Sequence, residues 1–202
     1  KARRIKEDVK VIDLPGIYSL SPYSLEEIIS RNYILEEKPD VVINIVDATN
    51  IERNLYLTTQ LIELGIPVVV ALNMMDAVES RGDQIDIPRL EKQLGVPVLP
   101  TSANKAQGIK ELIERSLQVA QSAATGLMPE STTVFDAQIE KGLKELVVFM
   151  TPKLKQMYPA RFATLKLLEG DEIVIDNIQP DSEFMDAIIA IRGQLEQVYD
   201  NE

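Results

Sequence analysis

The sequence predicts an α/β domain built on a doubly wound, mostly parallel sheet, followed by a small all-α domain. Two observations predict this. Up to about residue 125, short runs rich in Val and Ile alternate with amphipathic stretches, as in a parallel sheet covered by helices. Beyond that point the Val- and Ile-rich runs stop and only helical periodicity continues. We therefore expect one domain over residues 1–126 and a second over 127–202.

The strands of the first domain are expected where short runs are apolar at every position. Runs of this kind are typical of parallel strands buried on both faces. The expected strands are 9–12, 41–46, 68–72 and 96–99, and the expected helices between and after them are 24–37, 50–64, 86–94 and 107–124.

Capping residues support the predicted helix ends. Ser24 and Glu27 have the spacing of a capping box, in which each side chain accepts a backbone amide hydrogen of the first turn. Pro88 falls in a first turn, where proline is tolerated, and Gly65 and Gly95 follow predicted helices at the usual position for a C-terminal cap.

The second domain is expected to contain helices only. Apolar residues recur every three to four positions along it, which indicates helices with one buried face. The expected helices are 132–150, 158–169, 171–176 and 182–199, and Gly170 is expected to end the second of them.

Composition excludes several classes of function. The 202 residues include no cysteine and no histidine, which removes disulfides, thiolate and imidazole catalysis and the usual zinc sites. The net charge of −11 disfavours a nucleic-acid partner, which would need a basic surface. No apolar run approaches the ~20 residues of a membrane span and no signal peptide is evident, so a soluble cytosolic chain is expected.

Three tetrapeptides indicate the function. Each follows an apolar run, at the carboxyl end of a predicted strand, where open α/β sheets bind ligands. In this order and setting they match the last three nucleotide loops of a Ras-like guanine-nucleotide-binding domain. They are Asp13-Leu14-Pro15-Gly16, Asn73-Met74-Met75-Asp76 and Thr101-Ser102-Ala103-Asn104.

The second tetrapeptide carries the prediction of base specificity. Guanine presents N1–H and an N2 amino group side by side, and the Asp76 carboxylate can accept from both, whereas adenine has an acceptor at N1. We expect Asn73 to tie the loop together and reach the base edge. Met74 stands where most GTPases have a lysine, so it can cover the ring only by dispersion. The alternative is a strand-end turn that uses Asn and Asp for turn chemistry.

The first tetrapeptide is expected to face the phosphates. Asp13 would hold Mg²⁺ through a bound water, and the Gly16 amide would donate to the γ-phosphate. The alternative is a plain Pro-Gly turn. Ile17 occupies the position where many GTPases have a glutamine that orients the attacking water, so hydrolysis is expected to be slow or to use another group.

The third tetrapeptide is the least specific of the three. After the strand at 96–99, a loop here would offer backbone amides to guanine O6. The alternative is a Ser/Thr helix cap.

The loop that normally cradles the phosphates is absent from the sequence. That loop needs Gly-x-x-x-x-Gly-Lys-Ser/Thr, because bare amides wrap the phosphates and lysine neutralises them. None of the nine glycines is followed by lysine. We therefore expect the chain as given to be inactive as an enzyme.

The chain resembles the cytosolic region of the ferrous iron transport protein B family, bacterial transporters with an N-terminal GTPase domain. The resemblance covers essentially the whole chain. It is carried by residues 13–20, by Asn44-Ile45-Val46-Asp47, by Arg53-Asn54-Leu55, by Met74, by Tyr158-Pro159-Ala160-Arg161 and by residues 167–171.

The resemblance implies GTP or GDP as ligand, Mg²⁺ as cofactor and slow hydrolysis that regulates Fe²⁺ uptake. It also implies a helical domain likened to nucleotide-dissociation inhibitors, a membrane permease domain as partner, and a place on the cytoplasmic face of the inner membrane. Potassium activation of the intact protein and a homo-oligomer are left open.

Two other functions remain open at this point. One is a pseudo-GTPase interaction module that binds no nucleotide. The other is a stand-alone Ras-like GTPase of translation or ribosome assembly, which the acidic charge disfavours.

Overall fold

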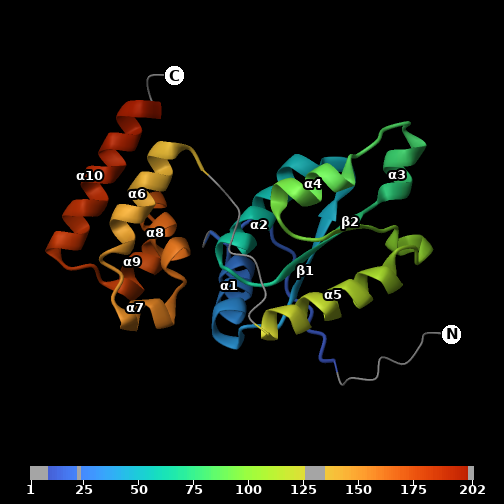
Figure 1. Cartoon of the computed structure of the whole chain (residues 1–202), viewed down its shortest axis with the longest axis horizontal. Coiled ribbons are helices and arrows are strands. Elements are labelled where there is room, and N and C mark those ends of the chain that lie inside the picture. The colour runs from blue at the N-terminus through green and yellow to red at the C-terminus, as the bar shows by residue number, and fades with distance from the viewer. Residues whose placement is uncertain (1–8, 22–23, 126–134, 200–202) are drawn as a thin grey trace.

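The computed structural model describes residues 9–21, 24–125 and 135–199. Within them the chain forms an α/β part and a helical module that lies beside it (Figure 1). The strands are β1 (Val42–Asp47), β2 (Val68–Asn73) and β3 (Val98–Pro100). The helices of the α/β part are α1 (Leu25–Glu37), α2 (Ile51–Glu63), α3 (Met75–Ser80), α4 (Ile87–Leu94) and α5 (Ile109–Ala124), with short 3₁₀ turns η1 (Ala48–Asn50) and η2 (Ala103–Lys105).

The three described strands form one parallel sheet in the order β1-β2-β3. Helices α2 and α4 lie on one side of it and α5 on the other (Figure 1). The side chains of β2 alternate accordingly: Val68, Val70 and Leu72 join the main core, and Val69 and Ala71 pack with α5. This is the doubly wound arrangement predicted from the sequence.

The predicted strand at 9–12 is wrong. These residues have no regular structure, and Val9, Val11 and Ile12 are 47, 85 and 42 % exposed. A strand needs a neighbour for its backbone hydrogen bonds. Among the described residues none pairs with this segment, since the ladder ends at β1.

The expectation that every strand is buried on both faces is also wrong for β1. Ile43 and Ile45 are 40 and 67 % exposed. They are in register with Val69 and Ala71 of β2, on the face that α5 covers. Because α5 packs across β2, it leaves this face of β1 open.

The predicted helices of the α/β part are confirmed to within two residues, and so are their caps. Ser24 and Glu27 form both bonds of the capping box, and Gly95 ends α4 in the left-handed conformation. Helix α3 was missed, because its first turn lies inside the Asn73–Asp76 loop, where no apolar periodicity marks it.

The helical module contains α6 (Ala137–Val147), α7 (Pro152–Met157), α8 (Ala160–Glu169), α9 (Glu172–Ile178) and α10 (Ser182–Tyr199). Helix α7 was not expected. Gly170 ends α8 in the left-handed conformation, as predicted. The predicted domain boundary at 126/127 and the predicted start of the first helix at 132 lie outside the described residues.

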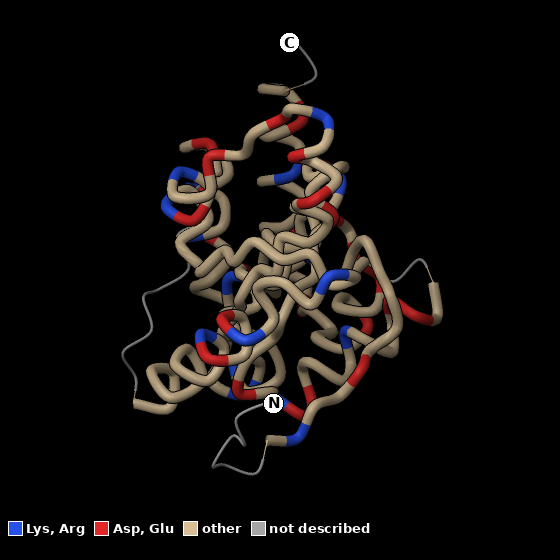
Figure 2. The backbone as a smooth tube through the Cα atoms, turned by 90° about the vertical axis from the view of Figure 1, so that its right-hand side faces the viewer, with Lys and Arg blue, Asp and Glu red and all other residues tan. Residues whose placement is uncertain are grey.

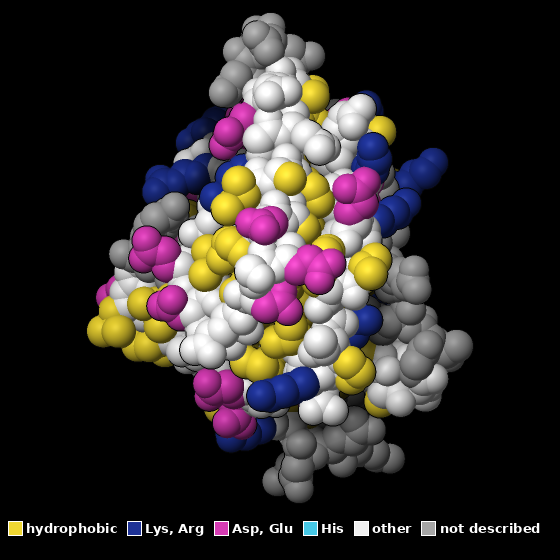
Figure 3. Space-filling view, turned by 90° about the vertical axis from the view of Figure 1, so that its left-hand side faces the viewer, with side chains coloured by type: hydrophobic (Ala, Val, Ile, Leu, Met, Phe, Trp, Pro, Cys, Tyr) yellow, Lys and Arg dark blue, Asp and Glu magenta, His cyan; other side chains and the backbone are white. Residues whose placement is uncertain are grey.

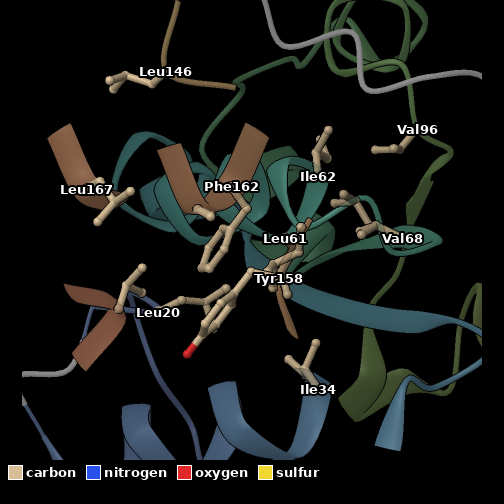
Figure 4. Close-up of a cluster of buried hydrophobic side chains, with 14 of the residues drawn as sticks. Leu20, Ile34, Leu61, Ile62, Val68, Val96, Leu146, Tyr158, Phe162 and Leu167 are labelled. Carbon is tan, nitrogen blue, oxygen red and sulfur yellow. The ribbon is translucent and has the colours of Figure 1, made fainter. Parts of the chain in front are cut away.

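The helical module and the α/β part share one core. Tyr158 and Phe162 belong to the same buried cluster as Leu20, Ile34 and Leu61 (Figure 4). Burial of both surfaces in a common core means that the helical module is docked on the α/β part.

Two ion pairs reinforce this joint. Arg31 of α1 lies 2.6 Å from Asp171 at the start of α9, and both side chains are buried. Arg161 Nε of α8 lies 2.7 Å from Glu63 Oε2 of α2, and within the helical module the same guanidinium also pairs with Glu140 of α6 at 2.7 Å.

Charged residues are distributed along both parts. Viewed from the side of the α/β part, Lys and Arg alternate with Asp and Glu along the backbone (Figure 2). On the opposite face, over the helical module, apolar side chains lie among acidic ones (Figure 3). Across the described ranges no helix has the length and hydrophobicity needed to cross a bilayer.

Candidate nucleotide-binding site

The loops after β2 and β3 are joined by their backbones. β2 and β3 pair in parallel, so both loops leave the same edge of the sheet. The Thr101 amide donates to the Leu72 carbonyl at 2.8 Å, and the Met75 amide donates to the Thr101 carbonyl at 3.2 Å. The second and third predicted tetrapeptides are therefore brought together by the sheet itself.

Side chains complete this junction. Asn73 Oδ1 accepts from the Ala103 amide at 3.0 Å and from the Thr101 hydroxyl at 3.3 Å. The Asp76 amide donates to Ser102 Oγ at 3.1 Å, and Thr101 and Ser102 are both buried. Asn73 thus ties the two loops together, as expected. Asn73 also accepts from the Ala103 amide. Of the backbone amides in the third tetrapeptide that were expected to bind guanine O6, the Asn104 amide therefore remains available.

Met74 is held in the left-handed backbone region, with φ 65°. A non-glycine residue there is uncommon and costs free energy, which the surrounding bonds must offset. This turn starts α3 one residue later and places Asp76 in the first turn of that helix. The Met74 side chain is 42 % exposed, which is compatible with covering a planar ring.

The Asp76 carboxylate lies at the centre of this edge. Its Oδ2 accepts from Lys105 Nζ at 3.1 Å and from Asn104 Nδ2 at 3.5 Å. The hydrogen bond from Lys105, helped by those from Asn104 and Ser102, lowers the pKa of Asp76 against the opposing effect of desolvation. Asp76 is therefore an ionised acceptor at neutral pH, which is the state that can bind two N–H groups of guanine.

Three residues that shape this loop were not predicted from the sequence. Lys105 reaches Asp76, and Gln107 closes the loop through a two-bond backbone bridge to Ser102. Gly108 has φ +75°, and a Cβ there would lie 2.2 Å from the Pro100 carbonyl oxygen. In the sequence, the glycine four residues after the end of the third tetrapeptide could have indicated this close approach of two backbone segments.

Asp13, Leu14, Pro15 and Gly16 have no regular secondary structure. Asp13 and Gly16 are exposed, while Leu14 packs against the core. The Pro15 carbonyl accepts from the Ser30 hydroxyl at 3.4 Å. A Cβ built on Gly16 meets nothing within 4 Å, so the fold of the described residues does not itself require glycine here.

The segment that follows Gly16 is held by side chains from α1 and α2. Gln60 Oε1 accepts from the Leu20 amide at 2.6 Å, and Arg31 donates to the Leu20 carbonyl at 3.3 Å. The Arg53 guanidinium lies 3.9 Å from the centre of the Tyr18 ring. Because Arg53 is in the first turn of α2, directly after β1, the segment passes the carboxyl end of the sheet.

The structure does not join Asp13–Gly16 to the other two loops. Between described residues, no hydrogen bond or ion pair connects them. No group of three or more carboxylates that could hold a metal ion is found within the described ranges either. Asp13 fits an ion held mainly by water and phosphates, as Mg²⁺ commonly is, and not a metal site made by the protein alone.

Asp47 caps the end of β1. Its Oδ1 accepts from the Thr49 amide at 2.8 Å and from the Thr49 hydroxyl at 2.7 Å.

A parallel sheet with helices on both faces and these loops at its carboxyl edge defines a Ras-like G domain, here joined to a helical domain. The family model for "Ferrous iron transport protein B" matches residues 1–116, and that for "FeoB cytosolic helical domain" matches residues 135–202. The chain belongs to the ferrous iron transport protein B (FeoB) family.

Individual relatives agree with this. A fusion protein of Fe(2+) transport protein A and Fe(2+) transporter FeoB from Porphyromonas gingivalis is 44 % identical over 167 residues, which are 81 % of this chain and 20 % of that protein. The chain therefore spans about a fifth of the length of that relative.

Two solved structures of S. thermophilus NFeoB are similar in fold to most of this chain. A mutant form bound to mGDP has a TM-score of 0.85 at 38 % identity, covering 93 % of this chain and 71 % of that one. NFeoB bound to GDP·AlF4⁻ and K⁺ has a TM-score of 0.84 at 37 % identity, covering 93 % and 72 %.

Proposed function

We propose that this chain is the guanine-nucleotide-binding cytosolic region of a prokaryotic Fe²⁺ transporter, and that the intact protein hydrolyses GTP to regulate Fe²⁺ uptake. The observation that carries the proposal is the Asp76 carboxylate, held ionised where the loops after β2 and β3 lock together. Family membership favours this function over a pseudo-GTPase module or a stand-alone GTPase of translation.

Base recognition would rest on Asp76, with Asn73 and Asn104 around it. Asp76 would accept from guanine N1–H and the N2 amino group, and the Asn104 amide would donate to O6. Sites that depend on such bonds reject analogues that lack them by ~10⁴-fold or more. Met74 would lie against the ring, and Met75, Thr101, Ser102 and Ala103 would hold the loops in place.

Phosphate contacts would rest on Asp13, Leu14, Pro15 and Gly16. Gly16 is exposed, and its amide would donate to a γ-phosphate, while Asp13 would hold a water of the Mg²⁺ shell. When bound, Mg²⁺ neutralises phosphate charge. Activation by K⁺ in the intact protein is compatible with the K⁺ named for the NFeoB complex with GDP·AlF4⁻.

The chain as given lacks the glycine-rich loop and lysine that make the charge-assisted bonds to phosphates. We therefore expect weak or no GTP binding by this chain, and micromolar binding by a longer form that carries a Gly-x-x-x-x-Gly-Lys-Ser/Thr loop. Titration of a fluorescent GTP analogue into both proteins tests this. The matched control is the longer form with that lysine replaced by alanine. Equal affinity in this chain and the longer form would contradict the proposal.

The helical module would report the nucleotide state to the membrane permease domain of the intact transporter, on the cytoplasmic face of the membrane. Its support is the shared core and the Arg31–Asp171 pair, since Arg31 also binds the Leu20 carbonyl. Hydrogen exchange of the longer form in GDP and in a GTP analogue should differ within 135–199. Identical protection in both states would make the module a spacer.

A further inference from the structure

The Asp76 carboxylate already has a cationic partner on an atom that guanine would need. Oδ2 accepts from Lys105 Nζ at 3.1 Å and from Asn104 Nδ2 at 3.5 Å. A carboxylate oxygen has two lone pairs, so these two donors fill Oδ2, and Oδ1 is the oxygen that has no cation on it. Guanine binds a carboxylate through both oxygens at once, so one donor must leave Oδ2 first.

Lys105 is the donor that can leave at low cost. Its side chain is 54 % exposed, whereas that of Asp76 is 17 % exposed. The released ammonium would be hydrated at once, and ion pairs with an exposed partner contribute little net free energy. The Lys105–Asp76 ion pair is thus strong enough to form in the absence of ligand and weak enough for a bound base to displace the ammonium.

The backbone around Lys105 is fixed, so only its side chain needs to move. The Lys105 amide donates to the Ser102 carbonyl at 2.9 Å, and Ala106 adopts φ 54° with its amide on the Ala103 carbonyl at 3.0 Å. The bridge between Ser102 and Gln107 closes the loop behind it. The ammonium is therefore presented to Asp76 by a structured loop.

We propose that Lys105 is a specificity-determining residue that competes with the guanine base for the Asp76 carboxylate. Met74 stands where most GTPases have a lysine, so the cation at this site comes from the neighbouring loop and binds the carboxylate instead of the ring. This inference rests on the proposed function. Its consequence is a guanine affinity that is held below the value Asp76 alone would give.

A base that needs only one oxygen is not subject to this competition. Hypoxanthine has N1–H and lacks the N2 amino group, so it can bind Oδ1 while Lys105 stays on Oδ2. Removal of Lys105 should therefore tighten binding of guanine and leave that of hypoxanthine unchanged. A residue that merely supports the loop would affect both bases alike.

The test compares GMP and IMP, whose phosphate groups are identical, so any effect of Lys105 on the phosphate cancels in the ratio. Both are titrated into the longer form that carries the phosphate loop and into its Lys105→Ala and Lys105→Gln variants, with amide NMR signals of residues 73–76 and 102–104 as readout. We expect the preference for GMP over IMP to rise about two- to fivefold in both variants, and this gain to shrink at high salt, which screens the pair.

Lys110→Ala is the matched control, because Lys110 is a 65 % exposed lysine paired with Glu114 on α5. It should leave both affinities unchanged. Equal tightening of GMP and IMP, or an unchanged or lower ratio in both Lys105 variants, would overturn the competition. If wild type and variants alike fail to prefer GMP over AMP, the proposed guanine site itself is wrong, and that result is distinct from a failure confined to Lys105.

Discussion

The two halves of the candidate site are held in different ways. The loops after β2 and β3 bind each other through Asn73, Thr101 and Ser102, all within the α/β part. The segment 13–21 instead depends on side chains of α1 and α2, and through Arg31 on the helical module. The register of the sheet is therefore enough to set the geometry of the loops proposed to read the base, whereas the geometry of the segment proposed to face the phosphates depends on how the helical module is docked.

The largest expected effect tests the base-reading half. Asp76→Asn replaces one acceptor with an amide donor, which would face the N2 amino group of guanine. In the longer form we expect GDP affinity to fall by roughly 10²-fold or more, and preference to move to xanthosine diphosphate, whose O2 accepts. Asp83→Asn, at an exposed position shortly after α3, is the control. Unchanged preference for GDP would exclude Asp76 from base recognition.

The second prediction tests what holds the segment 13–21, the other half of the candidate site. Arg31→Ala leaves Asp171 buried without its cation and frees the Leu20 carbonyl. Loss of one partner of a buried ion pair typically costs about 3–5 kcal/mol, which urea unfolding would measure. Arg115→Ala removes an exposed arginine of α5 and should change stability by less than about 0.5 kcal/mol. A cost for Arg31→Ala as small as that control would show that the pair does not hold the segment.

What the sequence predicts well are features that a local pattern determines. The helices with a clear apolar stripe or a capping box were predicted, as was the adjacency of the loops after β2 and β3. The features that were not predicted depend on contacts with residues distant in sequence. The segment 9–12 has the composition of a strand, yet only a neighbouring strand could make it one. Ile45 has the apolar character of a buried residue, yet α5 passes over β2 instead.

The candidate site follows the same rule. Asn73 and Asp76 could be proposed from the sequence because base chemistry demands those side chains in one short motif. Lys105 was missed because its contact with Asp76 depends on the left-handed turn at Ala106 and the close approach at Gly108. The Arg31–Asp171 pair spans 140 residues, a separation at which no motif connects the partners.

A third prediction concerns the pH dependence of the helical module's stability. Arg161 donates to both carboxylate oxygens of Glu140, and these bonds lower the pKa of Glu140 from 4.5 to about 2. A carboxyl with a lowered folded-state pKa contributes stability above its unfolded value, and this contribution is lost as the pH falls from about 4.5 towards 2.

Glu140→Gln should therefore be less stable than wild type at pH 7, and the difference should shrink between pH 4.5 and 2. Thermal melting at pH 7, 4.5 and 3 measures this. Glu145→Gln is a suitable control, because Glu145 forms a solvent-exposed pair with Lys141 on the same helix. A difference that stays constant with pH would show that the ionised Glu140 does not stabilise the helical module.

The smallest effect is expected at Ile17, in the segment 17–23 that we predict to be the mobile second switch; residues 22 and 23 lie outside the described ranges. Ile17 is partly buried and packs against the core, and its side chain has no group that can orient water. Ile17→Ala in the longer form should lower stability by about 1–2 kcal/mol and keep GTP turnover within tenfold of wild type. Ile17→Gln is the matched variant, because it adds an amide that can bind water at the same position. A loss of more than tenfold in Ile17→Ala, with unchanged GTP affinity, would mean that the side chain positions the reacting groups. The phosphate half would then depend on the side chains of its own residues, as we expect the base half to depend on Asp76.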